Sequence, residues 1–284
     1  MRFHCSEQSL VMKGSQVSGT GWQGAGAACA VLPEAFGPGL LGDVLRVPNN
    51  YTAIVPYRTE REPLQALLPP GLTVAGQPVV SFRARRAEGI EWADGTSHFV
   101  GVTTQVEVER ADGTRCAGMH FLIGWEDDAM VTIIGREVAG TVKLPADITF
   151  DRDVRRVDRW LVHHRGRPLL EVECRDAVGI TGIDLEELRA ARRSGCTIGY
   201  KGLPTVDGRA LGEHYATEIP TVAEVNSAWH IDGRVTLFDT RPQTALWHDR
   251  AVRALRSLPL LERLPGTCTF GTYSLDLGRA HRLT

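Results

Sequence analysis

The sequence predicts an α+β fold that is predominantly β, with only a few short helices in 284 residues. Two observations lead to this prediction. Short apolar segments, several with period-two alternation, recur along the chain after residue 43 and are typical of strands. Four Asp-Gly pairs, at 94–95, 112–113, 207–208 and 232–233, lie between extended segments. This dipeptide tolerates the positive φ that tight hairpin turns need, so the pairs favour antiparallel hairpins.

The predicted strands are short. The segment 99–108 is the clearest, because its second half alternates strictly between apolar and other residues. The predicted strands are 47–57, 79–82, 99–108, 121–124, 130–134, 168–174, 214–219, 222–230 and 268–277.

Three short helices are predicted, at 60–68, 184–193 and 249–258. In the second, Asp184 is the expected N-cap, Glu187 completes a capping box and Gly195 is the stop signal. The third is apolar at 252, 255 and 258 and ends before Pro259, which cannot continue a helix.

The chain divides by composition into two parts. Residues 1–42 are rich in Gly, Ala and Ser and bury little apolar surface, so we expect an N-terminal arm. Residues 43–284 carry the strand and helix signals and are predicted to form one domain, although length alone would also suit two domains.

The overall charge gives no sign of a nucleic-acid or membrane partner. The net charge is −2, no basic block is long, and no apolar run approaches the 18 residues of a membrane span. The N-terminus does not resemble a secretory signal, and six scattered cysteines show no metal-ligand spacing. We therefore expect free thiols, a cytoplasmic location, and neither metal nor cofactor.

Lys143 is the first candidate for chemistry. The chain has 32 basic residues of which only three are lysine, so 29 are arginine, and Lys143 lies in the apolar stretch 138–145. Arginine cannot act as an amine nucleophile, whereas a lysine desolvated by apolar neighbours can, because burial lowers its pKa. The alternative is a lysine at a strand end whose ammonium reaches water.

The motif Gly135-Arg136-Glu137, followed by Lys143, resembles the G-R-E…K signature of the acetoacetate decarboxylase family. Other family-like segments occur in the same order: Tyr57-Arg58-Thr59, Leu68 to Leu72, Lys201 to Pro204 with Asp207-Gly208, Ala228-Trp229, Leu237-Phe238 and Tyr273 to Asp276. The resemblance covers roughly residues 45–284. It implies a curved antiparallel sheet around an apolar pocket, a homo-oligomer, and a lysine that forms a Schiff base with a keto acid.

Three polar positions of the family pattern differ here. The position after the Schiff-base lysine holds Leu144, where the family has a second lysine. The catalytic glutamate of the family aligns near residues 100–102, and no acid lies between Thr96 and Val106. The arginine that meets the substrate carboxylate aligns near Asn49 or Asn50, so Asn50 is a substrate-binding candidate.

Four further residues are site candidates. Arg136 and Glu137 are predicted as acid/base groups or carboxylate anchors, with an ion pair that fixes the Lys143 loop as the alternative. Gln105 and His120, on adjacent predicted strands, are candidates for substrate binding, with a solvated outer face as the alternative.

The sequence thus predicts a lysine Schiff-base lyase of decarboxylase type, acting on a small or medium keto acid or a polyketide-like carbonyl compound. Its iminium is an electron sink, which also serves aldol cleavage, dehydration or cyclisation. A ligand-binding member without catalysis, and an enzyme that uses only acid/base groups such as Glu137 or His120, are the remaining alternatives.

Overall fold

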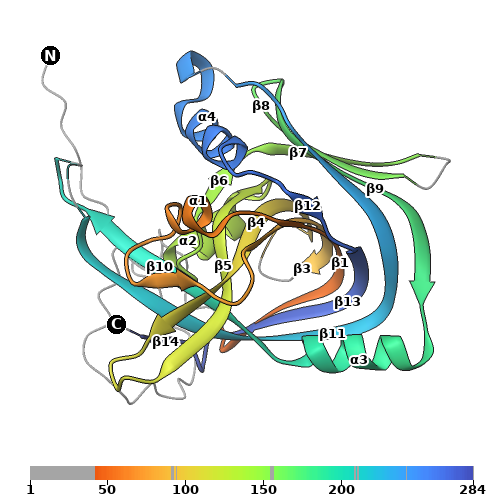
Figure 1. Ribbon diagram of the computed structural model, residues 1–284, viewed down its shortest axis with the longest axis horizontal. Helices are drawn as coiled ribbons and strands as arrows, with labels where there is room; N and C mark the ends of the chain where they lie inside the picture. Colours follow the sequence, from red (N-terminus) through yellow and green to blue (C-terminus); the bar gives the residue numbers. More distant parts are fainter. Residues whose placement is uncertain are drawn as a thin grey trace, which may run out of the picture. The chain divides into compact units, whose positions relative to one another are not determined.

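One strongly curved β-sheet dominates the computed structural model, which describes residues 42–283 except 91–92, 94, 154–156, 208, 210 and 241 (Figure 1). Within these residues the sheet has 14 strands, and its main path runs β10-β5-β4-β3-β1-β13-β11-β9-β8-β7. Nearly all its pairings are antiparallel, which confirms the predominantly β fold. The described residues belong to one compact unit, Leu40–Thr284; the predicted arm, apart from Gly42, lies outside them.

The strands are β1 (Val44–Arg58), β2 (Leu72–Val74), β3 (Val79–Ile90), β4 (Gly95–Glu109), β5 (Arg115–Glu126), β6 (Lys143–Pro145), β7 (Asp147–Arg152), β8 (Asp158–His164), β9 (Arg167–Ile180), β10 (Gly195–Pro204), β11 (Leu211–Leu237), β12 (Glu262–Arg263), β13 (Gly266–Asp276) and β14 (His281–Arg282). The helices are α1 (Arg61–Gln65), α2 (Ala129–Glu137), α3 (Gly182–Arg193) and α4 (Pro242–Arg256).

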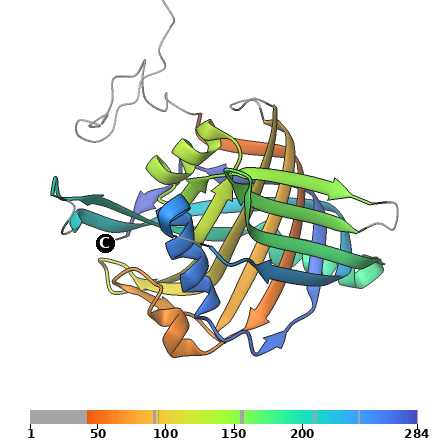
Figure 2. The ribbon, with the colours of Figure 1, turned by 90° about the horizontal axis from the view of Figure 1, so that it is seen from above.

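The sheet curls far enough for β7, the last strand of its main path, to return to β4 (Figures 1 and 2). Phe150 on β7 stacks against His98 on β4, with 6.3 Å between the ring centroids. The concave space is filled by a large apolar core in which Phe82, Trp125 and Trp160 are almost fully buried. Helix α4 adds Val252 and Leu255 to this core, and Leu258, two residues after the end of the helix, also belongs to it.

Period-two alternation gives β3 and β5 one apolar and one polar face. On β3, Phe82 and Ala84 enter the core while Arg83 and Arg85 lie on the other face. On β5, Trp125 enters the core and Glu126 lies on the other face, where it is buried. The second face of the sheet therefore collects charged residues that are shielded from water.

Helix α2 replaces the strand predicted at 130–134, so that prediction was wrong. The Asp128 side chain accepts a hydrogen bond from the Val131 N–H (2.8 Å) and caps the helix. Val131 and Ile134 are buried whereas Ile133 is exposed, a spacing that suits a helix and not a strand. The β-branched run thus forms a helix, and Gly135-Arg136-Glu137 is its last turn.

Two other local predictions need correction. Helix α3 begins at Gly182 with Thr181 as N-cap, so Asp184 lies in its first turn and forms no capping box. The predicted strands 214–219 and 222–230 are parts of the single strand β11, which also continues through Asp232-Gly233 without a turn.

Only one Asp-Gly turn is fully described. Gly113, with φ of 81°, makes the predicted hairpin between β4 and β5. Asp94 and Gly208 lie outside the described residues.

Gly233 is explained by packing instead of by a turn. A Cβ atom on Gly233 would lie 2.4 Å from Val55 Cγ2 in the core, which is far inside normal contact. Glycine lets β11 cross close above β1 at this point.

We therefore expect Gly233→Ala to lower the free energy of unfolding by about 1–3 kcal/mol, because the added methyl overpacks the core. Urea unfolding measures this change. Gly179→Ala on β9, where nothing lies within 4 Å of the added methyl, is the control and should be near neutral. In the Gly233→Ala/Val55→Ala double variant the two losses should be less than additive. Additive losses, with Gly233→Ala as mild as the control, would contradict the packing explanation.

Candidate active site

Strand register places three functional side chains in one row across the sheet. Arg85 on β3 is opposite Phe99 on β4, and Phe99 is opposite Glu126 on β5. Side chains directly opposite one another on adjacent strands share a face and lie close together. The row therefore brings a guanidinium and a buried carboxylate to either side of one aromatic ring.

Lys143 reaches this row from β6, a three-residue strand that pairs in parallel with the end of β5. Gly124 is opposite Lys143, and its missing side chain leaves room for the Phe99 ring, which a Cβ there would meet at 2.5 Å. Gly135 of α2 is equally restricted, because a Cβ there would lie 2.7 Å from Lys143 Cδ and Cε. The glycine of the G-R-E motif thus allows α2 to pack directly on the lysine side chain.

The Lys143 ammonium is almost completely enclosed, and the residue is only 9% exposed. Its Nζ atom donates to Glu126 Oε2 (2.7 Å) and to the Val131 carbonyl oxygen (3.3 Å). It also lies 5.1 Å from the centroid of the Phe99 ring, within the range of a cation–π contact. The alternative of a lysine that reaches water does not describe this side chain.

Glu126 is fully buried and has two other partners. Arg85 Nη2 lies 3.2 Å from Oε1, and the Ser97 hydroxyl also donates to Oε1. Arg85 alone balances the charge of this carboxylate. The cluster of Lys143, Arg85 and Glu126 is therefore neutral overall when the lysine has lost its proton, and carries one positive charge when it has not.

Burial is the main cause that lowers the pKa of Lys143 below its ordinary value. The carboxylate of Glu126 opposes this effect, and the positive charge of Arg85 adds to it. The net direction is downward, which increases the fraction of neutral amine near pH 7. Desolvation is thus the main cause of the lowered pKa of Lys143, as its apolar neighbours predicted. The positive charge that adds to this effect belongs to Arg85 and not to a neighbouring lysine.

Two cavities lie near this cluster. The smaller, of about 60 Å³, is lined by Asn50, Thr52, Arg83, Arg85, Phe99, Met119, Phe121 and Tyr273. It includes Arg85 and Phe99, two of the side chains around the Lys143 ammonium. On the scale of roughly 10–15 Å³ for each enclosed water, it has room for a few small groups.

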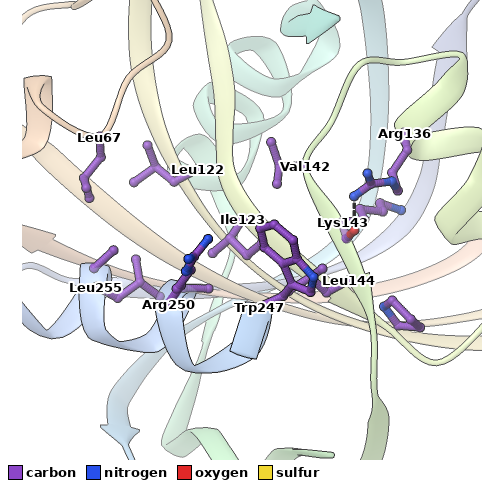
Figure 3. Close-up of a pocket in the computed structure, with 13 residues that line it drawn as sticks. Leu67, Leu122, Ile123, Arg136, Val142, Lys143, Leu144, Trp247, Arg250 and Leu255 are labelled. Carbon is purple, nitrogen blue, oxygen red and sulfur yellow. Dashed lines mark hydrogen bonds between the residues drawn. The ribbon is translucent and has the colours of Figure 1, made fainter. Parts of the chain in front are cut away.

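The larger cavity, of about 780 Å³, opens between β6, β5 and α4 (Figure 3). Its walls are mostly apolar, with Leu122, Ile123, Leu144 and Leu255 among them. Lys143 also lines it, but Glu126, Phe99 and Val131, which contact the ammonium, do not. The ammonium is therefore directed toward the charged row and not toward the centre of this cavity.

The structure separates the two predicted acid/base candidates of the G-R-E motif from the ammonium. Arg136 is exposed at the rim of the larger cavity, where its Nη1 donates to the Lys143 carbonyl oxygen (2.7 Å; Figure 3). Glu137 is exposed on α2, and its charge acts on Lys201. Arg136 thus holds the main chain of Lys143, which is close to the anchoring alternative, but through a carbonyl and not through an Arg136–Glu137 ion pair.

Of the predicted substrate-binding residues, the structure brings only Asn50 to the charged face, where it lines the smaller cavity. Gln105 is exposed, which agrees with the alternative that it lies on a solvated outer face. His120 is buried with Nδ1 2.8 Å from the Ile198 carbonyl oxygen, and burial lowers its pKa. Its neighbours Met119 and Phe121 line the cavity, so alternation directs His120 to the opposite face.

Arg85, Ser97 and Glu126 were not predicted from the sequence. The catalytic glutamate of the family was expected on β4, near residues 100–102, whereas the carboxylate beside Lys143 is Glu126 on the neighbouring strand β5. Likewise the arginine was expected on β1, whereas Thr52 of β1 is opposite Arg85 of β3. The alternation Phe82-Arg83-Ala84-Arg85 was the available signal, because it places two arginines on one face of a strand.

One group of potential metal ligands occurs among the described residues, formed by Cys116, Cys196 and Glu218. Glu218 is already paired with Arg110 (2.9 Å) and His281 (3.3 Å). Burial raises the pKa of both thiols, which keeps them protonated. None of these residues contacts Lys143, so the group has no part in the chemistry of the lysine.

No helix in the described part of the chain is long and apolar enough to cross a membrane.

Several solved structures are similar to this chain. The acetoacetate decarboxylase of Legionella pneumophila subsp. pneumophila str. Philadelphia 1 matches with a TM-score of 0.68 and 18% identity, over 86% of this chain and 88% of that one. An acetoacetate decarboxylase-like enzyme from Sphingomonas wittichii RW1 matches with a TM-score of 0.63 and 19% identity, over 92% of this chain and 100% of that one. The enduracididine biosynthesis enzyme MppR, complexed with pyruvate, matches with a TM-score of 0.60 and 16% identity, over 87% of this chain and 93% of that one.

These identities show a shared fold. No curated protein matches the sequence. The family model for acetoacetate decarboxylase, however, matches residues 34–279, which is most of the chain. This protein therefore belongs to the acetoacetate decarboxylase family.

Proposed function

We propose that this protein is a lysine Schiff-base lyase that acts on a small keto acid, with Lys143 as the amine that forms the iminium. The observation that carries the proposal is the buried Lys143–Glu126 contact of 2.7 Å beside Arg85. Family membership supports a lyase, and the three side chains supply an amine, a proton carrier and a fixed positive charge.

The first half of the reaction is iminium formation. The neutral Lys143 amine attacks the carbonyl carbon, an N–C bond forms, and the C=O π electrons move to the oxygen, which takes up a proton from solvent. Glu126, in contact with Nζ, accepts a proton from the nitrogen and returns it to the hydroxyl, which leaves as water. The product is an iminium between Lys143 and the substrate.

The second half uses the iminium as an electron sink. In a β-keto acid the bond to the carboxylate breaks, carbon dioxide leaves, and the electron pair forms an enamine. Glu126, which takes up a proton from solvent after the water has left, donates that proton to the enamine carbon. Water then hydrolyses the new iminium, which releases the ketone and restores the lysine.

An aldol or dehydration reaction through the same iminium is the second candidate. Arg83 and Arg85 both line the smaller cavity, and a guanidinium paired with a carboxylate stabilises the charge that decarboxylation must remove. Such pairing suits reactions in which the carboxylate is retained. MppR, which shares this fold, has been solved with the condensation product of pyruvate and imidazole 4-carboxaldehyde.

The proposal includes a small-molecule carbonyl substrate, a cytoplasmic location and a homo-oligomeric state. The other site candidates lie at the positions described above: Arg136, Glu137, Asn50, Gln105 and His120. Of these, Asn50 at the smaller cavity and Arg136 at the Lys143 carbonyl are the two placed to influence the reaction. Sedimentation analysis measures the oligomeric state.

The central prediction concerns covalent trapping. Incubation with a panel of small keto acids and sodium borohydride should add one reduced substrate to Lys143, because borohydride converts the iminium to a stable amine. Intact-mass spectrometry and peptide mapping locate the adduct, and its mass shows whether carbon dioxide has left. Lys143→Ala should give no adduct, whereas Lys201→Ala, the matched control on β10, should keep it. An adduct at Lys201, or full activity of Lys143→Ala, would rule out Lys143 as the nucleophile.

Glu126→Gln should slow adduct formation by about a hundredfold or more, the usual range for loss of a positioned acid/base group. The neutral amide keeps the shape of the side chain but carries no proton between nitrogen and oxygen. Glu137→Gln, which removes an exposed acid on α2, is the control and should leave the rate unchanged. The reverse result would assign the acid/base role to Glu137.

The pH dependence of Lys143 labelling should follow its lowered pKa. The reactive form is the neutral amine, so labelling by an amine reagent should increase through a midpoint below 10.5. Arg85→Gln removes a charge that lowers this pKa, and its midpoint should move to higher pH. Glu126→Gln removes a charge that raises it, and its midpoint should move to lower pH. Site-resolved mass spectrometry across pH measures all three, and an unchanged midpoint in both variants would exclude this electrostatic coupling.

A further inference from the structure

The smaller cavity has an excess of hydrogen-bond donors and positive charge. The described residues that line it include Arg83, Arg85, Asn50 and Tyr273, and no carboxylate. The Thr52 hydroxyl donates to Asn50 Oδ1 (3.2 Å), which leaves the amide N–H groups of Asn50 as donors. A concave site with such a lining is suited to an anion.

Arg83 has no charged partner among the described residues. Its Nη1 lies 3.1 Å from the Met119 sulfur, which is a weak acceptor, and it forms no ion pair there. Arg85, two residues along β3, is in contrast paired with Glu126. A guanidinium withdrawn from water without a carboxylate is costly, so its retention indicates a ligand that supplies the missing charge.

Arg192 adds a second such charge. It is partly buried in the last turn of α3 and forms no ion pair in the described part of the chain. Burial, together with the charges of Arg192 and Arg85, lowers the pKa of Arg83 to about 10.

The charges can be counted for the working form of the enzyme. With Lys143 neutral, Glu126 and Arg85 cancel, and Arg83 and Arg192 leave two positive charges without a described partner. A keto acid with one carboxylate would neutralise one of them. A keto acid with two carboxylates would neutralise both.

We propose that the substrate is a short-chain keto acid with two carboxylates, in which Arg83, supported by Arg192, binds the carboxylate farther from Lys143. Arg83 and Arg85 are two residues apart on β3, which is about 7 Å along a strand and the length scale of a short diacid. This assignment rests on the proposed function, because it places the carbonyl group of the diacid at Lys143.

The test compares two keto acids that differ by one carboxylate. Oxaloacetate and 2-oxobutyrate have the same four-carbon chain, and each is titrated against the wild type with sodium cyanoborohydride while the mass adduct on Lys143 is followed. Half-maximal trapping should require at least about tenfold less oxaloacetate, the value of one charge-assisted contact. Adducts that correspond to oxaloacetate and to its decarboxylated product differ in mass and are counted together.

Three variants identify the residues. Arg83→Gln should remove the preference, so that oxaloacetate and 2-oxobutyrate need similar concentrations for half-maximal trapping, and Arg192→Gln should reduce the preference by a smaller factor. Arg193→Gln is the matched control, because Arg193 is the exposed neighbour of Arg192 on the same helix. Equal trapping of both keto acids by the wild type, or a preference that survives Arg83→Gln, would overturn the proposal.

A second measurement does not depend on iminium formation. Succinate has two carboxylates and no carbonyl group, so it should raise the melting temperature of the wild type more than butyrate does, and this difference should disappear in Arg83→Gln. If succinate binds in this way but no keto acid is trapped, the dicarboxylate site stands and the Schiff-base function fails. If 2-oxobutyrate is trapped on Lys143 but succinate has no effect beyond that of butyrate, the function stands and the dicarboxylate site fails.

Discussion

The contact between the Lys143 ammonium and the buried Glu126 carboxylate is the interaction on which the site depends. A buried ion pair is a weak source of stability, because desolvation of both charges opposes their attraction. Here Arg85 gives the carboxylate a second partner, so that the lysine can lose its proton without leaving an unpaired negative charge. The cluster thus holds a lysine whose pKa is lowered in a place that water hardly reaches.

The geometry around the pair follows from small residues and short strands. Gly124 and Gly135 leave the space that the Phe99 ring and the lysine side chain occupy. Arg136 holds the Lys143 carbonyl, and Asp128 caps the helix that carries both Gly135 and Arg136. The G-R-E sequence is therefore a packing and anchoring element for the lysine, and its acidic residue, Glu137, is exposed on α2.

Much of the fold could be predicted from sequence, because alternation and turn residues are local signals. The strands β1, β4 and β13 were expected at nearly their observed positions, whereas β9, predicted at 168–174, continues to Ile180. The segment 130–134 was assigned to the wrong class, since β-branched residues favour strands and only the Asp128 cap and the burial spacing favour a helix. Asp232-Gly233 was wrongly assigned to a turn. Glycine is needed there because the strand passes close to Val55, and the sequence alone does not distinguish this requirement from that of a turn.

The site could be predicted only in part. Lys143 was selected as a candidate from the scarcity of lysine, its apolar neighbours and the resemblance of Gly135-Arg136-Glu137…Lys143 to the family signature. Glu126 and Arg85 could not be found in this way, since their closeness to Lys143 depends on the pairing of β3, β4, β5 and β6. Alignment to family positions led to β4 and β1, whereas Glu126 and Arg85 lie on the adjacent strands β5 and β3.

The row formed by Arg85, Phe99 and Glu126 has a consequence for folding fidelity. A slip of one residue between two strands exchanges the faces of every side chain on one of them. If β5 slipped by one residue, Trp125 would take the place of Glu126 beside Phe99, and a carboxylate would enter the apolar core. Such a molecule would retain its strand content and lose the Lys143–Glu126 contact. Under the proposed function, the chemical reactivity of Lys143 is therefore a measure of correct strand pairing across this part of the sheet, available in solution without a high-resolution structure.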